Sequence, residues 1–251
     1  MTRKCESMNK ENKNLPYVVC HMLTSLDGKI DGEYMHTPEC VLALQEYAKI
    51  RESYHCKATI YGTTTMVTTY ADGYIKELND ILDEYPREDH IVMNDAESYV
   101  ISIDLHGELA FHSKYIEKKN RPKAHIVEVL SKNVSDAYLA YLRDLEISYI
   151  FVGVGDQLDC HLLLKKLFEI FSIDQLMVAG GGYMNYSFAQ ENLIDELSII
   201  IAPVTDGNTT SVSIFEKGNF LPSKSPISFA LKDMNAINQN VVWLRYMKYK
   251  I

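Results

Sequence analysis

Short apolar runs alternate with helix-like segments between residues 124 and 179, and this alternation constrains the fold more than any other feature of the chain. Helices placed between successive strands are typical of a mostly parallel sheet whose two faces are both covered. We therefore predict an α/β fold. The expected strands cover 124–129, 147–152 and 175–179, and the expected helices cover 135–145 and 160–171.

The first part of the chain continues this pattern. The segment Tyr17–Leu23 is short and mostly apolar, which predicts a buried strand. A threonine N-cap followed by a proline predicts a helix from about 38 to 53. A second strand is expected over 58–61, and Gly62 separates it from a helix that opens on threonines.

Two other parts of the chain are less regular. In the segment 72–123 we expect strands at 90–93 and 99–103, and the segment could form a lid, a dimer arm or plain surface. The apolar segments 193–201 and 241–249 are separated by a stretch rich in Gly, Pro and Ser. Antiparallel strands added to the edge of the parallel sheet explain these last two segments.

We expect a flexible polar leader over residues 1–15 and a single domain over 16–251. The chain carries 25 Lys and Arg against 34 Asp and Glu, a net charge of −9, and its basic residues form no long run. Because affinity for a phosphate backbone depends on clustered positive charge, nucleic acid is not expected as a partner.

No apolar stretch approaches the roughly 18 residues that span a bilayer, and the leader lacks the apolar centre of a signal peptide. A cytoplasmic protein without a membrane partner is therefore expected. The five cysteines form no C-x-x-C pair, and the eight histidines show no metal-ligand spacing. We expect neither a disulfide framework nor a metal site.

Three consecutive glycines, Gly180, Gly181 and Gly182, lie between an expected strand and an expected helix. Glycines at such a turn let an anion approach bare backbone N–H groups at the positive end of the helix, which suits a phosphate or a pyrophosphate. A turn that only permits tight helix packing explains the same residues about equally well.

A similar turn follows the strand that ends before Gly62. Thr63 and Thr65 open the next helix, and two such turns at the carboxyl ends of parallel strands would face one crevice. Ordinary N-capping by threonine is the simpler explanation of this turn alone. Gly153 and Gly155 lack the third glycine of the dinucleotide fingerprint, so a standard Rossmann site is disfavoured.

The segment Ser25-Leu26-Asp27-Gly28 follows the first strand directly. A carboxylate at the mouth of a sheet could bind a polar substrate or transfer a proton, although Asp-Gly is also a common turn dipeptide. His21 lies inside the apolar strand, where a histidine is more often part of the core than a catalyst.

These segments together resemble a known family. The run YVVCHMLTSLDGKI, the turn from Gly62 to Val67, and the block from Leu176 to Gly207 are similar to the RibD C-terminal family. This family comprises the reductase domain of riboflavin biosynthesis, within the dihydrofolate-reductase-like fold. The resemblance runs from about Pro16 to the C-terminus.

The resemblance implies an NADPH-dependent reductase similar to 5-amino-6-(5-phosphoribosylamino)uracil reductase, with hydride transfer to the ribosyl C1′ and a homodimeric assembly. The residues by themselves leave NADPH and NADH open. The residues expected to hold the cofactor are Gly62, Thr63, Thr65, Thr69, Gly153, Gly180, Gly181, Gly182 and Tyr183.

On the substrate side, Asp27 is expected to orient or protonate the substrate, and Ser25 to line the cleft. His21 is expected to donate a proton if it reaches the cleft. Arg51 is a candidate for a substrate phosphate, on charge type alone.

Three positions depart from the family pattern. Many members carry Lys where this chain has His21, Glu where it has Ala179, and Asp where it has Thr69. Loss of charged groups from a cleft changes the substrate that the cleft can pair with. Two alternatives therefore remain: a related reductase of another pterin, pyrimidine or carbonyl compound, and a nucleotide-binding module without catalysis.

Overall fold

The computed structural model describes residues 14–78, 81–119, 121–155, 157–218, 221, 226–238 and 240–249. Nearly all of the expected leader lies outside these residues. The elements are β1 (Tyr17–Thr24), η1 (Glu33–His36), α1 (Pro38–Ser53), β2 (Ala58–Gly62), α2 (Thr63–Thr69), β3 (Ser98–Ile103), β4 (Tyr115–Ile116), β5 (Ala124–Ser131), α3 (Asp136–Asp144), β6 (Ser148–Val154), β7 (Gln157–Leu158), α4 (Cys160–Phe171), β8 (Gln175–Val178), α5 (Gly182–Gln190), β9 (Glu196–Ile201), β10 (Phe229–Ile237) and β11 (Val241–Lys248).

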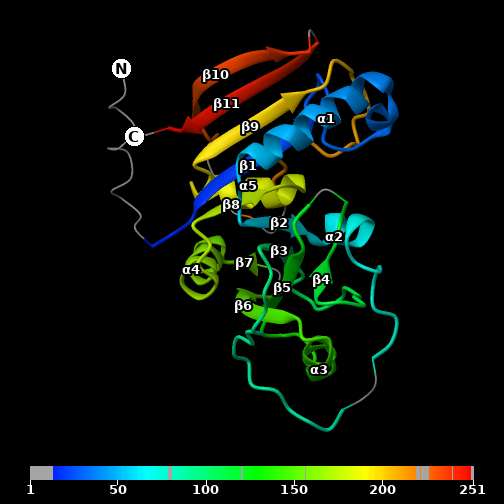
Figure 1. The fold of residues 1–251 in the computed structure, drawn as a ribbon, viewed down its shortest axis with the longest axis vertical. Coiled ribbons are helices and arrows are strands. Elements are labelled where there is room, and N and C mark those ends of the chain that lie inside the picture. Colours follow the sequence, from blue (N-terminus) through cyan, green and yellow to red (C-terminus); the bar gives the residue numbers. More distant parts are fainter. Residues whose placement is uncertain are drawn as a thin grey trace.

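All of these strands belong to one sheet, which runs in the order β10-β11-β9-β1-β8-β2-β3-β5-β6-β7, with β4 beside β5. The pairs between β9 and β6 are all parallel. The pairs that β10 and β11 form are antiparallel. Figure 1 shows these two strands at one end of the sheet and α3 at the other. The predicted α/β class and the mostly parallel mixed sheet are confirmed.

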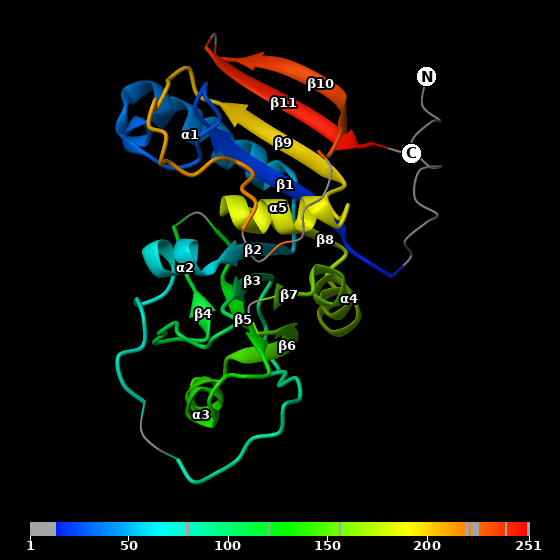
Figure 2. The ribbon, with the colours of Figure 1, turned by 180° about the vertical axis from the view of Figure 1, so that it is seen from behind.

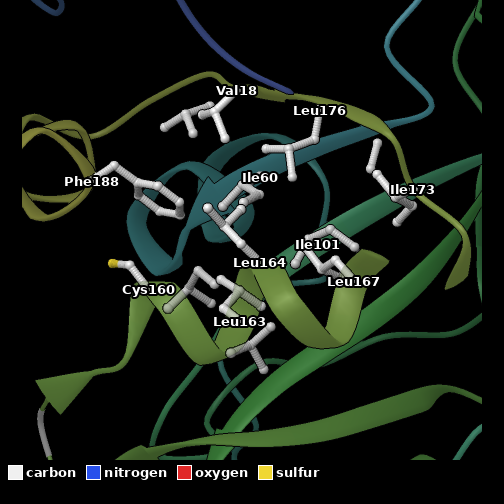
Figure 3. Packing of buried hydrophobic residues seen from close by; sticks show 14 of the residues in the cluster. Val18, Ile60, Ile101, Cys160, Leu163, Leu164, Leu167, Ile173, Leu176 and Phe188 are labelled. Atoms are coloured by element: carbon white, nitrogen blue, oxygen red, sulfur yellow. The ribbon is translucent and has the colours of Figure 1, made fainter. Parts of the chain in front are cut away.

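Each face of the sheet carries its own core. On one face, alternate residues of the parallel strands, such as Val18 and Ile60, pack against Leu164 and Leu167 of α4 (Figure 3). On the other face, α3 covers the β5 and β6 side of the sheet, and α1 covers the β1 and β9 side. The carboxyl ends of the parallel strands therefore open on one common edge, between the two helical layers.

The helices begin where local chemistry predicts. Thr37 caps α1 through a bond from the Cys40 N–H to its hydroxyl (3.3 Å), and Pro38 takes the first helical position. Asp159 caps α4 in the same way, by accepting the Leu162 N–H (2.8 Å). The predicted bounds of both helices are confirmed.

The strand predicted at 90–93 is wrong. Only His90 forms a bridge, with Tyr149, because this segment lies along the outer edge of β6 without pairing further. The chain before it runs around α3 (Figure 2), where Arg87 donates to the Asp136 carboxylate (2.5 Å) and to the Val134 carbonyl (3.0 Å). Tertiary contacts, and not strand pairing, hold this part of the segment 72–123.

The strand β10 was not predicted. Most of its side chains are exposed or half-exposed, and β11 is its only neighbour in the sheet, so it carries little apolar alternation. The predicted strand over 193–201 is confirmed as β9, but it pairs with β1 in parallel, and only its pairing with β11 is antiparallel.

Candidate functional site

The two predicted glycine turns lie side by side at the carboxyl edge of the sheet. Gly62 ends β2 and Gly180 follows β8, and these strands are parallel neighbours. A Cβ atom added to Gly62 would lie 3.9 Å from the Gly180 carbonyl oxygen, and one added to Gly180 would lie 3.5 Å from Thr65 Oγ1. The two turns therefore face one another across a narrow gap, as the sequence predicts.

The backbone at the second turn requires glycine. Gly180 and Gly181 have φ values of +138° and +82°, which side chains of L-residues rarely allow. Neither Gly62 nor Gly181, the residues that precede α2 and α5, supplies a side-chain hydrogen bond to the helix start. Gly62 and Gly181 are partly exposed and Gly180 is buried, so the backbone of the first two residues is the part open to an anionic cofactor group.

Gly182 serves a different purpose. A Cβ atom there would clash with the Ser213 carbonyl oxygen and would lie 2.9 Å from Glu216 Cγ. The Glu216 N–H donates to the Gly182 carbonyl (3.0 Å), and Asn185 Nδ2 donates to the Ile214 carbonyl (2.8 Å). The third glycine therefore lets the segment 213–216 pack on α5, which is the tight-packing alternative.

Of the other residues expected at the cofactor, Tyr183 and Thr63 lie next to the turns, and Thr69 and Gly153 lie further away. Tyr183 lies in the first turn of α5, next to the glycines, and is 51% exposed. The Thr63 hydroxyl donates to the Ile103 carbonyl (2.7 Å), which ties α2 to β3. Thr69 lies at the far end of α2. Gly153 is on β6, three strands from β2, where a Cβ atom would lie 2.8 Å from Leu105, so the structure does not bring it to the turns.

Asp27 holds a loop. Its carboxylate accepts the Ser25 hydroxyl (2.6 Å) and the backbone N–H groups of Asp206 (3.0 Å) and Gly207 (2.9 Å). These hydrogen bonds lower the pKa of Asp27, so the group is ionised at neutral pH. A permanently ionised carboxylate does not donate a proton, so this geometry disfavours Asp27 as a proton donor. Its role in orienting the substrate stays a prediction.

His21 is fully buried between β9 and α1. Its Nδ1 lies 2.9 Å from Ser198 Oγ, its Nε2 lies 3.1 Å from the Tyr47 carbonyl oxygen, and its ring stacks on Tyr47 with centroids 4.4 Å apart. Burial lowers the pKa of His21 to about 4, so the ring is neutral at pH 7. Because both nitrogens already have partners, the geometry favours a core histidine, and its role as a proton donor stays a prediction.

A pocket of about 570 Å³ opens on the face of the sheet that α1 covers, between the last turn of α1 and the first residues of β2, β3 and β5. Arg51, the residue expected at a substrate phosphate, lines it. The other lining residues that carry charge or a phenol are Glu52, Lys57, Tyr61, Tyr70, Glu97, Tyr99, Lys118 and Arg121.

Arg51 and Arg121 are joined through two tyrosines. Arg51 Nη2 donates to Thr59 Oγ1 (3.0 Å) and to the Tyr61 hydroxyl (2.9 Å). Arg121 Nη1 donates to the Tyr70 hydroxyl (2.8 Å), and the Tyr70 hydroxyl donates to that of Tyr61 (2.9 Å). Within the described ranges neither guanidinium has a carboxylate partner, so the pocket wall carries positive charge that an anionic ligand can neutralise.

Sequence reasoning found Arg51 but missed Tyr61, Tyr70 and Arg121. Tyr61 is the last apolar residue of a buried strand, so the sequence predicts that it is part of the core. Arg121 follows an irregular segment whose position in space the sequence does not fix. The only available signal was that Tyr61 and Thr59 alternate on one face of the predicted strand.

Across the described part of the chain, no three His, Cys, Asp or Glu residues gather closely enough to hold a metal ion. In that same part, every helix is too short or too polar to cross a bilayer.

The match to the family described as RibD C-terminal domain covers residues 16–243. A curated relative is the 2,5-diamino-6-ribosylamino-4(3H)-pyrimidinone 5′-phosphate reductase of Methanothermobacter thermautotrophicus, 28% identical over 93 residues. That alignment takes in 37% of this chain and 43% of the relative.

Solved structures share the fold. RibD of Acinetobacter baumannii superposes with a TM-score of 0.62 at 19% identity, over 94% of this chain and 58% of that protein. A pyrimidine reductase-like protein of Corynebacterium diphtheriae gives 0.66 at 13% identity, over 98% and 96% of the two chains. The riboflavin biosynthesis reductase of Saccharomyces cerevisiae gives 0.58 at 16%, over 95% and 92%.

Proposed function

Because the chain belongs to the RibD C-terminal domain family, we propose that it is an NADPH-dependent reductase of a phosphoribosylaminopyrimidine, with hydride transfer to the ribosyl C1′. Its relatives include a pyrimidinone phosphate reductase and a riboflavin biosynthesis reductase, which supports this class of substrate. The observation that carries the proposal is the pairing of two bare glycine turns with an arginine-lined pocket in one sheet.

The glycine turns fit a dinucleotide. Gly62 and Gly181 are partly exposed, Gly180 is buried between them, and Thr65 Oγ1 lies beside Gly180 as a further donor. We assign the cofactor phosphates to these residues, with Tyr183 at the margin. When bound, the cofactor supplies the hydride, and the protein holds and orients the two reactants.

The pocket fits the phosphorylated end of the substrate. Tyr61 lines the pocket and lies one residue before Gly62, and the rest of the sheet lining comes mostly from the first residues of β2, β3 and β5. Arg51, which has only neutral oxygens as partners among the described residues, binds the phosphate in our proposal. The substrate therefore extends from the carboxyl edge, where hydride transfer occurs, along the face of the sheet towards Arg51.

A related reductase with another substrate is the second candidate. Ala179 offers no polar side chain directly before the glycines, and His21 turns both nitrogens into the core. A pterin, a different pyrimidine or a carbonyl compound would suit a cleft that lacks these two polar contacts.

Fluorescence titration with NADPH and NADH, followed by addition of the deaminated phosphoribosylaminopyrimidine, tests the proposal. We expect tighter binding of NADPH and loss of reduced-nicotinamide absorbance when the pyrimidine is added. Cofactor binding without oxidation would favour the second candidate. Failure to bind either nucleotide would contradict both and would leave the glycine turns as structural features.

We also propose a cytoplasmic homodimer. The exposed apolar side chains Leu231 (59%) and Met234 (66%) on the terminal strand β10 support a second copy at this end of the sheet. Light scattering on the purified protein distinguishes a dimer from a monomer.

A further inference from the structure

The hydroxyls of Tyr61 and Tyr70 in the pocket wall carry two protons, and only one of these protons has a hydrogen-bond acceptor among the described residues. Each phenol oxygen receives an N–H from an arginine, Tyr61 from Arg51 and Tyr70 from Arg121. The Tyr70 hydroxyl then donates its own proton to the Tyr61 oxygen (2.9 Å). The Tyr61 oxygen therefore accepts two hydrogen bonds, and its own O–H has no acceptor among the described residues.

Packing keeps this arrangement in place. The rings of Tyr61 and Tyr70 lie 4.6 Å apart with their planes tilted by 37°, and Lys118 Nζ lies 5.5 Å from the centre of the Tyr70 ring. Lys118 Nζ also donates to the Thr69 carbonyl (2.9 Å), which fixes it at the end of α2. Tyr61 is 5% exposed and lines the pocket, so bulk water has little access to it.

The Tyr61 hydroxyl stays protonated. Burial raises the pKa of Tyr61 above its usual range, and Arg51 opposes this rise only in part. A neutral phenol whose oxygen is already occupied by two donors can act in one way, by donating its proton to an acceptor on a ligand.

Building on the proposed function, we infer that Tyr61 is a substrate-binding residue that donates a hydrogen bond to an anionic oxygen of a phosphate ester in the pocket, beside Arg51. Tyr70 and Arg121 are positioning residues: Arg121 orients the Tyr70 hydroxyl, and Tyr70 occupies the Tyr61 lone pair, which turns the Tyr61 proton towards the ligand. The cause is the bonding pattern: Arg51 and Tyr70 both donate to the Tyr61 oxygen, so in this arrangement the Tyr61 proton is the one without an acceptor among the described residues.

Tyr61 lies beside Ala179, the position on the neighbouring chain segment where many family members carry Glu. The Ala179 N–H donates to the Ile60 carbonyl (3.2 Å), which places the two strands together at the residue before Tyr61. Tyr61 thus supplies a polar group on the sheet face at the level where β8 supplies none.

Calorimetric titration with ribose 5-phosphate, and with ribose as the uncharged reference, tests the inference on the full chain. The variants are Tyr61→Phe, Tyr70→Phe and the double variant, since Phe keeps the ring and its packing. Tyr74→Phe is the matched control, because Tyr74 is 55% exposed and does not line the pocket.

We expect Tyr61→Phe to weaken ribose 5-phosphate binding about tenfold, as for a lost hydrogen bond to a charged group, with a smaller loss for ribose. Tyr70→Phe should weaken it about threefold. The double variant should match Tyr61→Phe, because Tyr70 acts only through Tyr61. A purely structural pair would give additive losses of thermal stability without this non-additive pattern in affinity.

Wild-type affinity in Tyr61→Phe would overturn the inference, as would no binding of ribose 5-phosphate by the wild-type protein. NADPH titration of the same samples separates this failure from failure of the proposed function. If the wild-type protein binds NADPH and oxidises it when the pyrimidine is added, but Tyr61→Phe binds ribose 5-phosphate normally, only the role of Tyr61 is rejected. If the wild-type protein does not bind NADPH, the proposed reductase function is rejected.

Discussion

The carboxyl-edge turns and the sheet-face pocket, which we propose as two binding regions, are built by opposite means. At the edge, Gly62, Gly180 and Gly181 contribute backbone without side chains of their own. In the pocket, Arg51 and Arg121 contribute charge that two tyrosine hydroxyls hold in place. The difference teaches that, in our proposal, phosphorylated groups meet backbone in one region and charged side chains in the other. Separate experiments can therefore test whether a given residue belongs to the turns, to the pocket or to neither.

The largest effect is expected at His21, which the geometry places in neither region. Its pKa is about 4 in the folded protein and about 6.5 in the unfolded chain, so its contribution to stability is complete above pH 6.5 and is lost as the pH falls towards 4. This gap corresponds to at most about 3 kcal/mol. Chemical denaturation at several pH values should show a shallower loss of stability in His21→Gln.

The matched control is His125→Gln, because burial lowers the pKa of His125 to about 4 as well, on a strand far from α1. Comparable changes in the two variants would mark both as core histidines. An unchanged stability profile in His21→Gln, together with a changed pH profile of turnover, would place His21 in the site instead.

Arg51→Ala should give the next largest effect. The loss of charge-assisted bonds predicts about thirtyfold weaker binding of ribose 5-phosphate, with NADPH affinity unchanged. Lys49→Ala is the control: Lys49 lies on the same helix, with its side chain 67% exposed, and pairs only with Glu46 among the described residues. Equal losses in the two variants would mean that general charge, and not Arg51, attracts the phosphate.

Gly181→Ala tests the other region. A φ of +82° strains an alanine by about 1 kcal/mol or more, and the added methyl group covers the turn, so NADPH should bind about tenfold more weakly while ribose 5-phosphate is unaffected. Gly73→Ala introduces comparable strain, at φ +99°, outside both regions. Weaker NADPH binding in the control as well would assign the loss to global strain.

The smallest effect is expected for Asp27→Asn. Its carboxylate holds the backbone of Asp206 and Gly207, and the amide oxygen of Asn retains part of this bonding, so turnover should fall by no more than about threefold. Steady-state kinetics checks this value. A fall of a hundredfold or more would restore Asp27 to the chemical step.

The same contrast explains what the sequence could and could not predict. The glycine turns lie next to strand ends in the chain, and parallel strands bring their carboxyl ends to one edge, so local pattern sufficed for this region. The start of α1 followed from Thr37 and Pro38 in the same way.

The pocket could not be predicted in this way. Arg51 lies in the last turn of α1, Tyr61 lies near the end of β2, Tyr70 follows α2, and Arg121 precedes β5. Only the tertiary fold brings these four residues together. The predicted strand at 90–93 failed for a related reason, because the edge of β6 sets the path of that segment. Gly182 shows the remaining limit: its role depends on the segment 213–216, which is distant in sequence.

The most direct test of two separate sites is calorimetric titration of ribose 5-phosphate into the free protein and into the protein saturated with NADPH. Our account predicts that the sugar phosphate binds in both cases with similar or improved affinity, because none of the turn glycines lines the pocket. Competition, in which saturating NADPH abolishes binding of ribose 5-phosphate, would contradict the account and would reduce the two regions to one.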